Sequence, residues 1–258
     1  MAHDQPVPGK TATRQKLILS GLYLSKYDVL GLKNLGFDNF VEAFNVIGYA
    51  LGSKPASIKN YRDEFDPLFP NQRKGWHKRP TRDYCRTVYE EYKGLDFESF
   101  TGLVQSFFGF DQNAWSESAP TEQQDDGASS FAQRLITGLA AERYFESIHA
   151  DLPEFKGYQL QNTTRYGCGF DFRLRIEPNH QDFLAVEVKG LKDQNGSLSM
   201  TPKEYDVASK LKERFYLFVV KNFRESPSHM LFQNPLTSGL NFRRTERITV
   251  QVSWLTTV

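Results

Sequence analysis

Three charged residues in the C-terminal half of the chain have the types and spacing of a metal site. Fifteen residues separate Asp171 from Glu187, and Lys189 follows Glu187 at the second position. Two carboxylates that face each other on neighbouring strands repel and destabilise the pair, and a divalent cation between them would reverse that effect. Mg²⁺ commonly takes one or two carboxylates together with water and a substrate phosphate. These residue types therefore predict a Mg²⁺ site on Asp171 and Glu187.

The segments that carry these residues are predicted to form a β-hairpin. Residues 169–176 and 183–189 alternate apolar and polar side chains on either side of a polar, proline-containing turn. Glu187 and Lys189 share one face of the second strand because side chains alternate. A turn centred on Asn179 places Asp171 opposite Glu187 on that face, whereas a shift of one residue would separate them. Burial of such charges is costly, so this strand end is expected to open into a cleft.

The residues around this hairpin resemble the PD-(D/E)XK nuclease superfamily, in its EVK-type form found in restriction systems and fused to helicases. The resemblance covers about residues 130–235, with Phe170 in the place of the family's proline. It is carried by the segments Gly138-Leu-Ala-Ala-Glu142, Gly169-Phe-Asp171, Glu187-Val-Lys189, Ser199-Met-Thr-Pro-Lys-Glu204 and Phe215-Tyr-Leu217, with Ala208.

The resemblance implies Mg²⁺-dependent hydrolysis of a phosphodiester that leaves 5′-phosphate and 3′-hydroxyl ends. Asp171 and Glu187 would hold Mg²⁺, and Lys189 would orient or help deprotonate the attacking water and stabilise charge on the phosphate. Glu142 matches an acidic position of the family's first helix, where it would complete the metal shell, although it also fits an exposed helix charge. Glu204 has a local explanation, because with Thr201 it forms the pattern of a capping box.

Two arginines and a cysteine lie beside the predicted site. Arg173 and Arg175 share the face of Asp171, where they suit either phosphate contact or simple exposure to solvent. Cys168 has no role in this chemistry and is interpreted as structural.

The N-terminal half is predicted to be mostly helical. Asp38 is a candidate N-cap for a helix that ends near Gly52, and a second helix begins at Pro55. A tight helix pair fits a helix-turn-helix that binds DNA or an ordinary pair within a bundle. In a helix-turn-helix, the second helix would present to DNA the side chains of Lys54, Ser57, Lys59 and Asn60.

A basic segment follows this helix pair. Residues 53–86 contain nine Lys and Arg against four Asp and Glu, a balance of +5, although the whole chain carries only +1. Basic side chains at this density suit phosphate contacts, and a tryptophan among them can stack or wedge; a basic loop is also a common solubility feature. The DNA contacts predicted in this loop are Arg73, Lys74, Trp76, Lys78 and Arg79.

Composition divides the chain into parts. Residues 112–129 are polar and acidic and resemble a linker. We expect a flexible tail (1–15), a helical DNA-binding domain (16–111), the linker (112–129) and a PD-(D/E)XK nuclease domain (130–258). The fold class is α/β, with helices followed by the order helix–strand–strand–helix–strand.

The remaining features exclude several classes of protein. No apolar run approaches a membrane span, no leader peptide is recognisable, and two distant cysteines exclude a disulfide framework or zinc site. We therefore expect a cytoplasmic protein without a membrane partner. No phosphate-binding GxxxxGK[ST] loop occurs, so no nucleotide cofactor is expected.

These expectations favour a type II restriction endonuclease. It would use Mg²⁺ to cut double-stranded DNA at a specific short sequence, and by analogy with the family it would act as a homodimer. One alternative is another nuclease of the superfamily, for repair or for branched DNA. The other is a non-catalytic helix-turn-helix DNA-binding protein whose nuclease-like domain is a platform for interactions.

Overall fold

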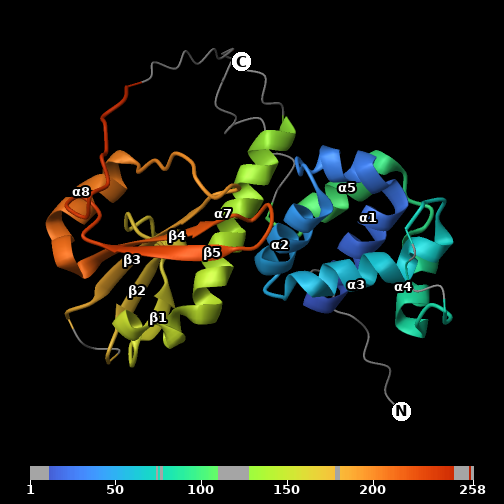
Figure 1. The fold of residues 1–258 in the computed structure, drawn as a ribbon, viewed down its shortest axis with the longest axis horizontal. Helices are drawn as coiled ribbons and strands as arrows, with labels where there is room; N and C mark the ends of the chain where they lie inside the picture. Colours follow the sequence, from blue (N-terminus) through green and yellow to red (C-terminus); the bar gives the residue numbers. More distant parts are fainter. Residues whose placement is uncertain are drawn as a thin grey trace.

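The fold combines N-terminal helices with a five-stranded mixed sheet, as a computed structural model shows. It describes residues 12–73, 75, 78–109, 128–177, 181–246 and 256. The N-terminal helices form one group, the sheet lies on the other side, and helix α7 (Ala128–Ile148) runs between them (Figure 1). The predicted α/β class is confirmed at this level, whereas the assignments to PD-(D/E)XK and helix-turn-helix folds stay predictions.

The helical half contains both helices of the predicted pair and three more. Its helices are α1 (Thr13–Asn34), α2 (Phe40–Ala50), α3 (Pro55–Phe65), α4 (Asp83–Tyr92) and α5 (Phe97–Ser106). Helix α1 was not predicted, and its first residues fall in the part expected to be a tail. Short 3₁₀ turns, here and in the other half, are η1 (Asp66–Leu68), η2 (His149–Asp151), η3 (Pro153–Phe155), η4 (Thr164–Tyr166) and η5 (Lys212–Arg214).

The N-cap of α2 was predicted one residue too early. Asn39, not Asp38, caps the helix, since its side-chain oxygen accepts the N–H of Glu42 at 2.9 Å. The Glu42 carboxylate in turn accepts the N–H of Asp38 at 2.9 Å. Asn and Asp are both good caps, and the exchange with Glu42 decides between them.

The sheet has five strands in the order β1-β2-β3-β4-β5. The strands are β1 (Gln159–Asn162), β2 (Phe172–Arg175), β3 (Leu184–Gly190), β4 (Phe215–Lys221) and β5 (Ser228–Gln233). Strands β3 and β4 are parallel, joined through helix α8 (Pro202–Leu211), and the other pairs are antiparallel. The predicted hairpin of β2 and β3 forms, and β1 and β5 extend the sheet on either side.

Helices cover both faces of the central strands, which explains their apolar sequences. On one face, β-strand residues including Phe172, Val186 and Phe218 belong to a core shared with Phe145 of α7. On the other face a smaller cluster joins Phe170, Ala185 and Phe215 to Ala208 of α8. Glu187 and Lys189 alternate with Val186 and Val188, so they lie on the α8 face.

The helical half packs directly on α7 and the sheet. One hydrophobic cluster runs through both halves, and the rings of Tyr49 and Tyr144 meet at 5.1 Å. The Asn45 side chain donates to the backbone carbonyls of Phe223 and Glu225 at 2.8 and 3.1 Å. Most of the predicted linker lies outside the described residues, but the two halves share a core. Within the described ranges, no helix has the length and hydropathy needed to cross a bilayer.

Candidate functional site

Asp171 and Glu187 meet where β2 begins, beside the middle of β3. Strand β2 pairs Phe172 with Val186, and this register, continued by one residue, sets Asp171 opposite Glu187 as predicted. The Asp171 N–H donates to the Val186 carbonyl at 3.0 Å. Its carboxylate accepts the N–H of Val188 at 2.8 Å. Two backbone groups of β3 therefore hold Asp171 in place, one through its N–H and one through its carboxylate.

Lys189 binds two carboxylates at once. Its Nζ lies 2.6 Å from Oε1 of Glu187 and 2.9 Å from Oε2 of Glu204. The capping box predicted for Glu204 with Thr201 is present, and the same Glu204 oxygen that closes it also accepts from Lys189. Capping was the favoured prediction for Glu204, and the contact with Lys189 adds a second role. Glu204 lies in the first turn of the helix that follows β3, and this position is the signal in the sequence that could have indicated its contact with Lys189.

Burial and crowding of charge perturb the protonation of this site. The Glu187 side chain is only 4% exposed, and its burial, with repulsion from Asp171, raises its pKa to about 8 despite the nearby Lys189. Burial also raises the pKa of Asp171, although the Val188 N–H opposes the change. For Lys189, burial is the largest single influence and acts to lower the pKa, but the charges and hydrogen bonds of Glu187 and Glu204 together outweigh it, so the pKa is raised.

Glu142 approaches the site from the other layer. It lies half-buried on α7, and burial followed by the charges of Asp171 and Glu146 raises its pKa to about 7. Asp171 is thus close enough to influence the protonation of Glu142, and the membership of this glutamate in the site stays a prediction. Carboxylates with pKa values near neutrality are typical of sites that exchange protons or bind cations.

The carboxylates supply oxygen donors but not a preformed metal cage. Among the described residues, no group of three or more His, Cys, Asp and Glu side chains is arranged to hold a metal ion. Asp171 and Glu187 together provide the one or two carboxylates that Mg²⁺ commonly takes from a protein. The Lys189 ammonium pairs with two carboxylates, and the carboxylate of Asp171 lies opposite Glu187, so negative charge is in excess. The donor set therefore fits a hard cation whose remaining ligands are water and phosphate.

Without metal, the protein is expected to lose stability as the pH rises from about 4.5 to about 8. The folded state keeps protons on Glu142 up to about pH 7 and on Glu187 up to about pH 8, whereas both ordinarily titrate at 4.5. The folded state then binds more protons than the unfolded chain across this window, so the free energy of unfolding falls with pH. Glu187→Gln should flatten this slope. Urea unfolding in EDTA at several pH values measures it, and equal slopes for the variant and the wild type would contradict the assignment.

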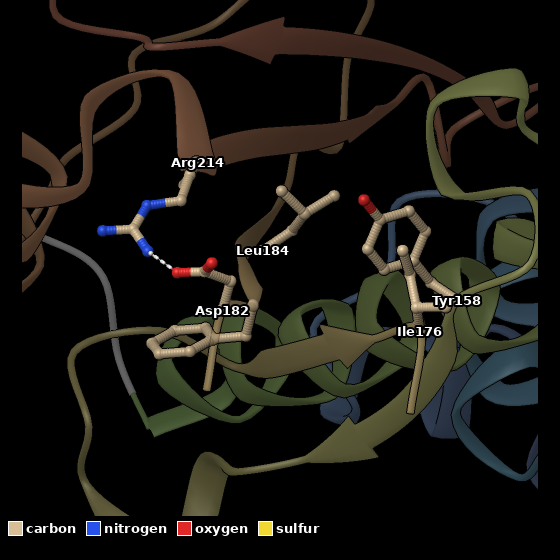
Figure 2. A pocket seen from close by; sticks show the side chains of 6 residues that line it. Tyr158, Ile176, Asp182, Leu184 and Arg214 are labelled. Carbon is tan, nitrogen blue, oxygen red and sulfur yellow. Dashed lines mark hydrogen bonds and ion pairs between the residues drawn. The ribbon is translucent and has the colours of Figure 1, made fainter. Parts of the chain in front are cut away.

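A pocket of about 460 Å³ lies at the opposite end of β3 (Figure 2). Leu184, at the start of β3, lines it, and an ion pair between Arg214 and Asp182, 3.0 Å apart, closes one side. The carboxylates of the candidate site do not line this pocket; these are Glu142, Asp171, Glu187 and Glu204. It is therefore separate from the charged end of β3.

The residues predicted to touch DNA have different environments. Lys54, Lys59 and Asn60 of the α3 region are exposed, as is Lys78, while Ser57 is half-buried and accepts from Ser53 Oγ at 3.0 Å. Lys59 also pairs with Asp63 at 2.8 Å. Lys74 and Trp76 lie outside the described residues. Exposure of the α3 side chains agrees with DNA contact, which stays a prediction.

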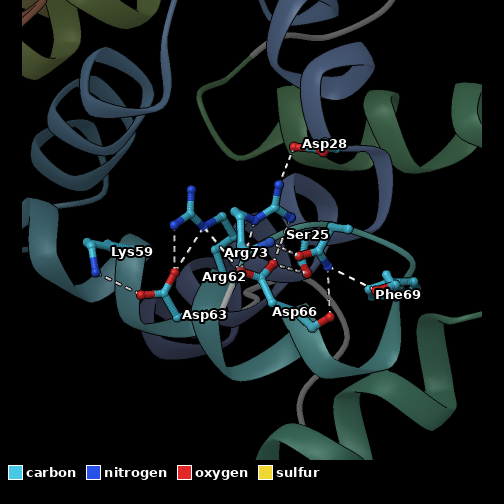
Figure 3. Close-up of polar contacts among 9 residues, drawn as sticks. Ser25, Asp28, Lys59, Arg62, Asp63, Asp66, Phe69 and Arg73 are labelled. Atoms are coloured by element: carbon cyan, nitrogen blue, oxygen red, sulfur yellow. Dashed lines mark hydrogen bonds and ion pairs between the residues drawn. The ribbon is translucent and has the colours of Figure 1, made fainter. Parts of the chain in front are cut away.

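Arg73 and Arg79 bind buried acids of their own half. Two nitrogens of Arg73 donate to the fully buried Asp66 at 2.9 and 2.7 Å, and a third reaches Asp28, where α1 departs from helical geometry (Figure 3). Ser25 Oγ donates to the same Asp66 carboxylate at 2.8 Å. Arg79 binds both oxygens of buried Glu64 at 2.9 and 2.6 Å. Both arginines, predicted as DNA contacts, therefore anchor the ends of the basic loop to the helical half.

Arg73→Gln is expected to destabilise the protein by about 3 kcal/mol. Among the described residues, the buried charge of Asp66 would then keep only the more distant Arg62, 3.9 Å away, as an ion-pair partner. Lys54→Gln, at an exposed position, should leave the free energy of unfolding nearly unchanged. Urea denaturation of both variants tests this difference. If Arg73→Gln were as stable as Lys54→Gln, the structural role assigned to Arg73 would be wrong.

The fold and site together define a class: a mixed α/β domain that groups carboxylates around a lysine on its central strands. Residues 141–232 match the family model described as "Protein NO VEIN, C-terminal", which is linked to nucleases of the restriction-endonuclease-like type. The matched part contains all of the site residues, Glu142, Asp171, Glu187, Lys189 and Glu204. Neither the comparison with curated proteins nor the comparison with solved structures found a match.

Proposed function

We propose that this protein is a Mg²⁺-dependent endonuclease that hydrolyses phosphodiester bonds of duplex DNA at a specific short sequence, as type II restriction endonucleases do. The observation that carries the proposal is the position of Lys189, 2.6 Å from Glu187 and 2.9 Å from Glu204, next to the opposed Asp171. A structural salt bridge needs only one carboxylate. A phosphodiesterase site needs an excess of carboxylates for a cation and a lysine for the phosphate.

Each residue has a separate role in the proposal. Asp171 and Glu187 hold Mg²⁺, which when bound supplies Lewis acidity to the phosphate and lowers the pKa of water. Lys189 keeps its proton, because its raised pKa favours the ammonium form, and donates from Nζ to a phosphate oxygen. This favours charge stabilisation by Lys189 over removal of a proton from water.

Glu142 and Glu204 complete the proposed machinery from two helices. Glu204 orients the Lys189 ammonium through its 2.9 Å contact and is therefore a positioning residue. Glu142, with a pKa of about 7, accepts or returns a proton on its carboxylate at the pH where the enzyme works. Burial of the site against α7 and α8 keeps these groups in fixed geometry.

The helical half would bring the duplex to the site. Lys54, Lys59 and Asn60 at α3, with Lys78, present exposed donors that suit phosphate and base contacts. Because this half packs on α7, DNA held by α3 is held at a defined distance from β3. A homodimer would place two such sites on a palindromic sequence, one for each strand.

The test is incubation of the purified chain with unmethylated phage DNA in Mg²⁺ and, in parallel, in EDTA. Discrete fragments that form only with Mg²⁺ are the expected result. A Mg²⁺-dependent smear would keep the nuclease activity but reject sequence specificity. Intact DNA with a normal gel shift would reject catalysis and favour a DNA-binding protein.

A further inference from the structure

Arg173 lies on β2 two residues from Asp171, with its guanidinium over two aromatic rings. The central carbon of the guanidinium is 4.8 Å from the ring centre of Phe183 and 5.7 Å from that of Phe170. The two rings are themselves 5.7 Å apart. Stacking on aromatic faces restricts the planar guanidinium of an arginine, so the two rings hold the head group in place.

The charge of Arg173 has no counterpart in the described structure. Its Nε is buried and has no hydrogen-bond partner, and among the described residues no carboxylate lies within ion-pair distance of it. Other arginines of the chain differ, since Arg62, Arg73, Arg79 and Arg214 all pair with Asp or Glu. A half-buried, unpaired cation is costly, and a bound anion would remove that cost.

The strands around Arg173 leave a polar face beside the site. Strand β1 pairs Gln161 with Arg173 and Gln159 with Arg175, and both glutamines are exposed. Cross-strand partners point to the same face, so these four side chains continue the face that carries Asp171. Beyond β1, the exposed Arg165 adds a further positive charge at the same end of the sheet. A row of amides and guanidiniums suits a phosphate backbone better than an apolar partner.

We propose that Arg173 binds a backbone phosphate of the DNA strand that is cut, next to the phosphate held at Asp171, Glu187 and Lys189. The inference rests on the proposed function and deepens it, because it predicts that the DNA strand runs along β2 from the reacting phosphate to Arg173. Two residues of a strand span about 6.6 Å, which sets the Arg173 head group beside the reacting position. The guanidinium fork donates two parallel N–H groups to phosphate oxygens.

The test measures binding of a short fluorescent duplex in EDTA, by anisotropy, over a range of NaCl concentrations. Arg173→Gln should bind roughly tenfold more weakly and lower the slope of log Kd against log salt by about 1. Arg173→Lys should keep the slope but bind more weakly than the wild type, because lysine lacks the fork. Arg214→Gln removes the same charge from an arginine that already pairs with Asp182 at 3.0 Å and should bind as the wild type does.

Each outcome separates this inference from the proposed function. A wild-type affinity and slope for Arg173→Gln, or an equal loss for Arg214→Gln, would overturn the phosphate site even if Mg²⁺-dependent cleavage is observed. If the wild-type protein binds DNA but does not cleave it, the proposed nuclease activity is rejected. The phosphate site is then still decided by whether Arg173→Gln weakens binding. If the wild type does not bind DNA, the inference is wrong. Should Arg173→Gln fail to fold, unchanged affinity of Arg173→Lys would overturn the proposal.

Discussion

Asp171→Asn is expected to abolish Mg²⁺-dependent cleavage, with a loss of roughly a thousandfold or more, and to leave the fold intact. The amide oxygen can still accept the Val188 N–H that Asp171 binds at 2.8 Å, so the strand pairing is kept. The substitution removes an anionic ligand and also removes repulsion from Glu187. Thermal unfolding in EDTA should therefore show a variant at least as stable as the wild type, and single-turnover cleavage measures the loss of activity.

Asp206→Asn is the matched control for this prediction. Asp206 is an exposed residue of α8 that pairs with Lys210 at 2.6 Å, and a surface pair of this kind contributes little to stability. The control should cleave DNA at the wild-type rate. Substantial cleavage by Asp171→Asn would show that Asp171 is not a metal ligand, whereas loss of activity in both variants would indicate a general effect of lost charge.

Lys189→Met is expected to have the second large effect, on activity and on stability together. Cleavage should fall by roughly a hundredfold or more, as when one donor to a developing charge is removed. At pH 8 the variant should also be less stable by about 3 kcal/mol, because Glu187 and Glu204 lose the cation between them. Lys210→Met, at an exposed position of α8, should change neither quantity.

The loss of stability in Lys189→Met should shrink as the pH falls. Burial and repulsion already raise the pKa of Glu187 to about 8, and loss of the ammonium raises it further. A folded carboxyl with a raised pKa takes up a proton as the pH falls toward its ordinary value of 4.5, and the buried charge is then gone. Urea unfolding in EDTA at pH 8 and near pH 5 tests this. A destabilisation that is constant with pH would instead indicate lost packing of the lysine stem.

The nuclease function proposed for the sheet half has more support than the DNA binding proposed for the helical half. The match to the family model covers the sheet and α7 from residue 141 onward and does not reach the helical half. In that half, the charge balance of +5 over residues 53–86 overstates the free positive charge. Arg62 pairs with the half-buried Asp63, and Arg73 and Arg79 neutralise the buried acids Asp66 and Glu64. The exposed lysines of α3 are therefore the sharper targets for DNA-binding variants.

Local patterns in the sequence were sufficient for most helices and for the central hairpin. The alternation of side chains along 183–189 determines that Glu187 and Lys189 share a face. The sequence left the register of the hairpin open by one residue, and the strand pairing in the structure sets Asp171 opposite Glu187. Helices α2, α3 and α8 follow from apolar spacing, and α3 and α8 also from Pro at their first turns. These features depend on residues close together in the chain, so they can be predicted from it.

Tertiary structure alone decided the partners of the charged side chains. Glu204 reaches Lys189 only because the chain after β3 returns α8 over the sheet, and Arg73 reaches Asp28 and Asp66 only because α1 and α3 lie together. Strands β1 and β5 were not predicted. Strand β1 is short and mostly polar, and its pairing with β2 is what makes it a strand. Such contacts depend on loop paths and on competition between distant partners, and no local pattern in the sequence determines either.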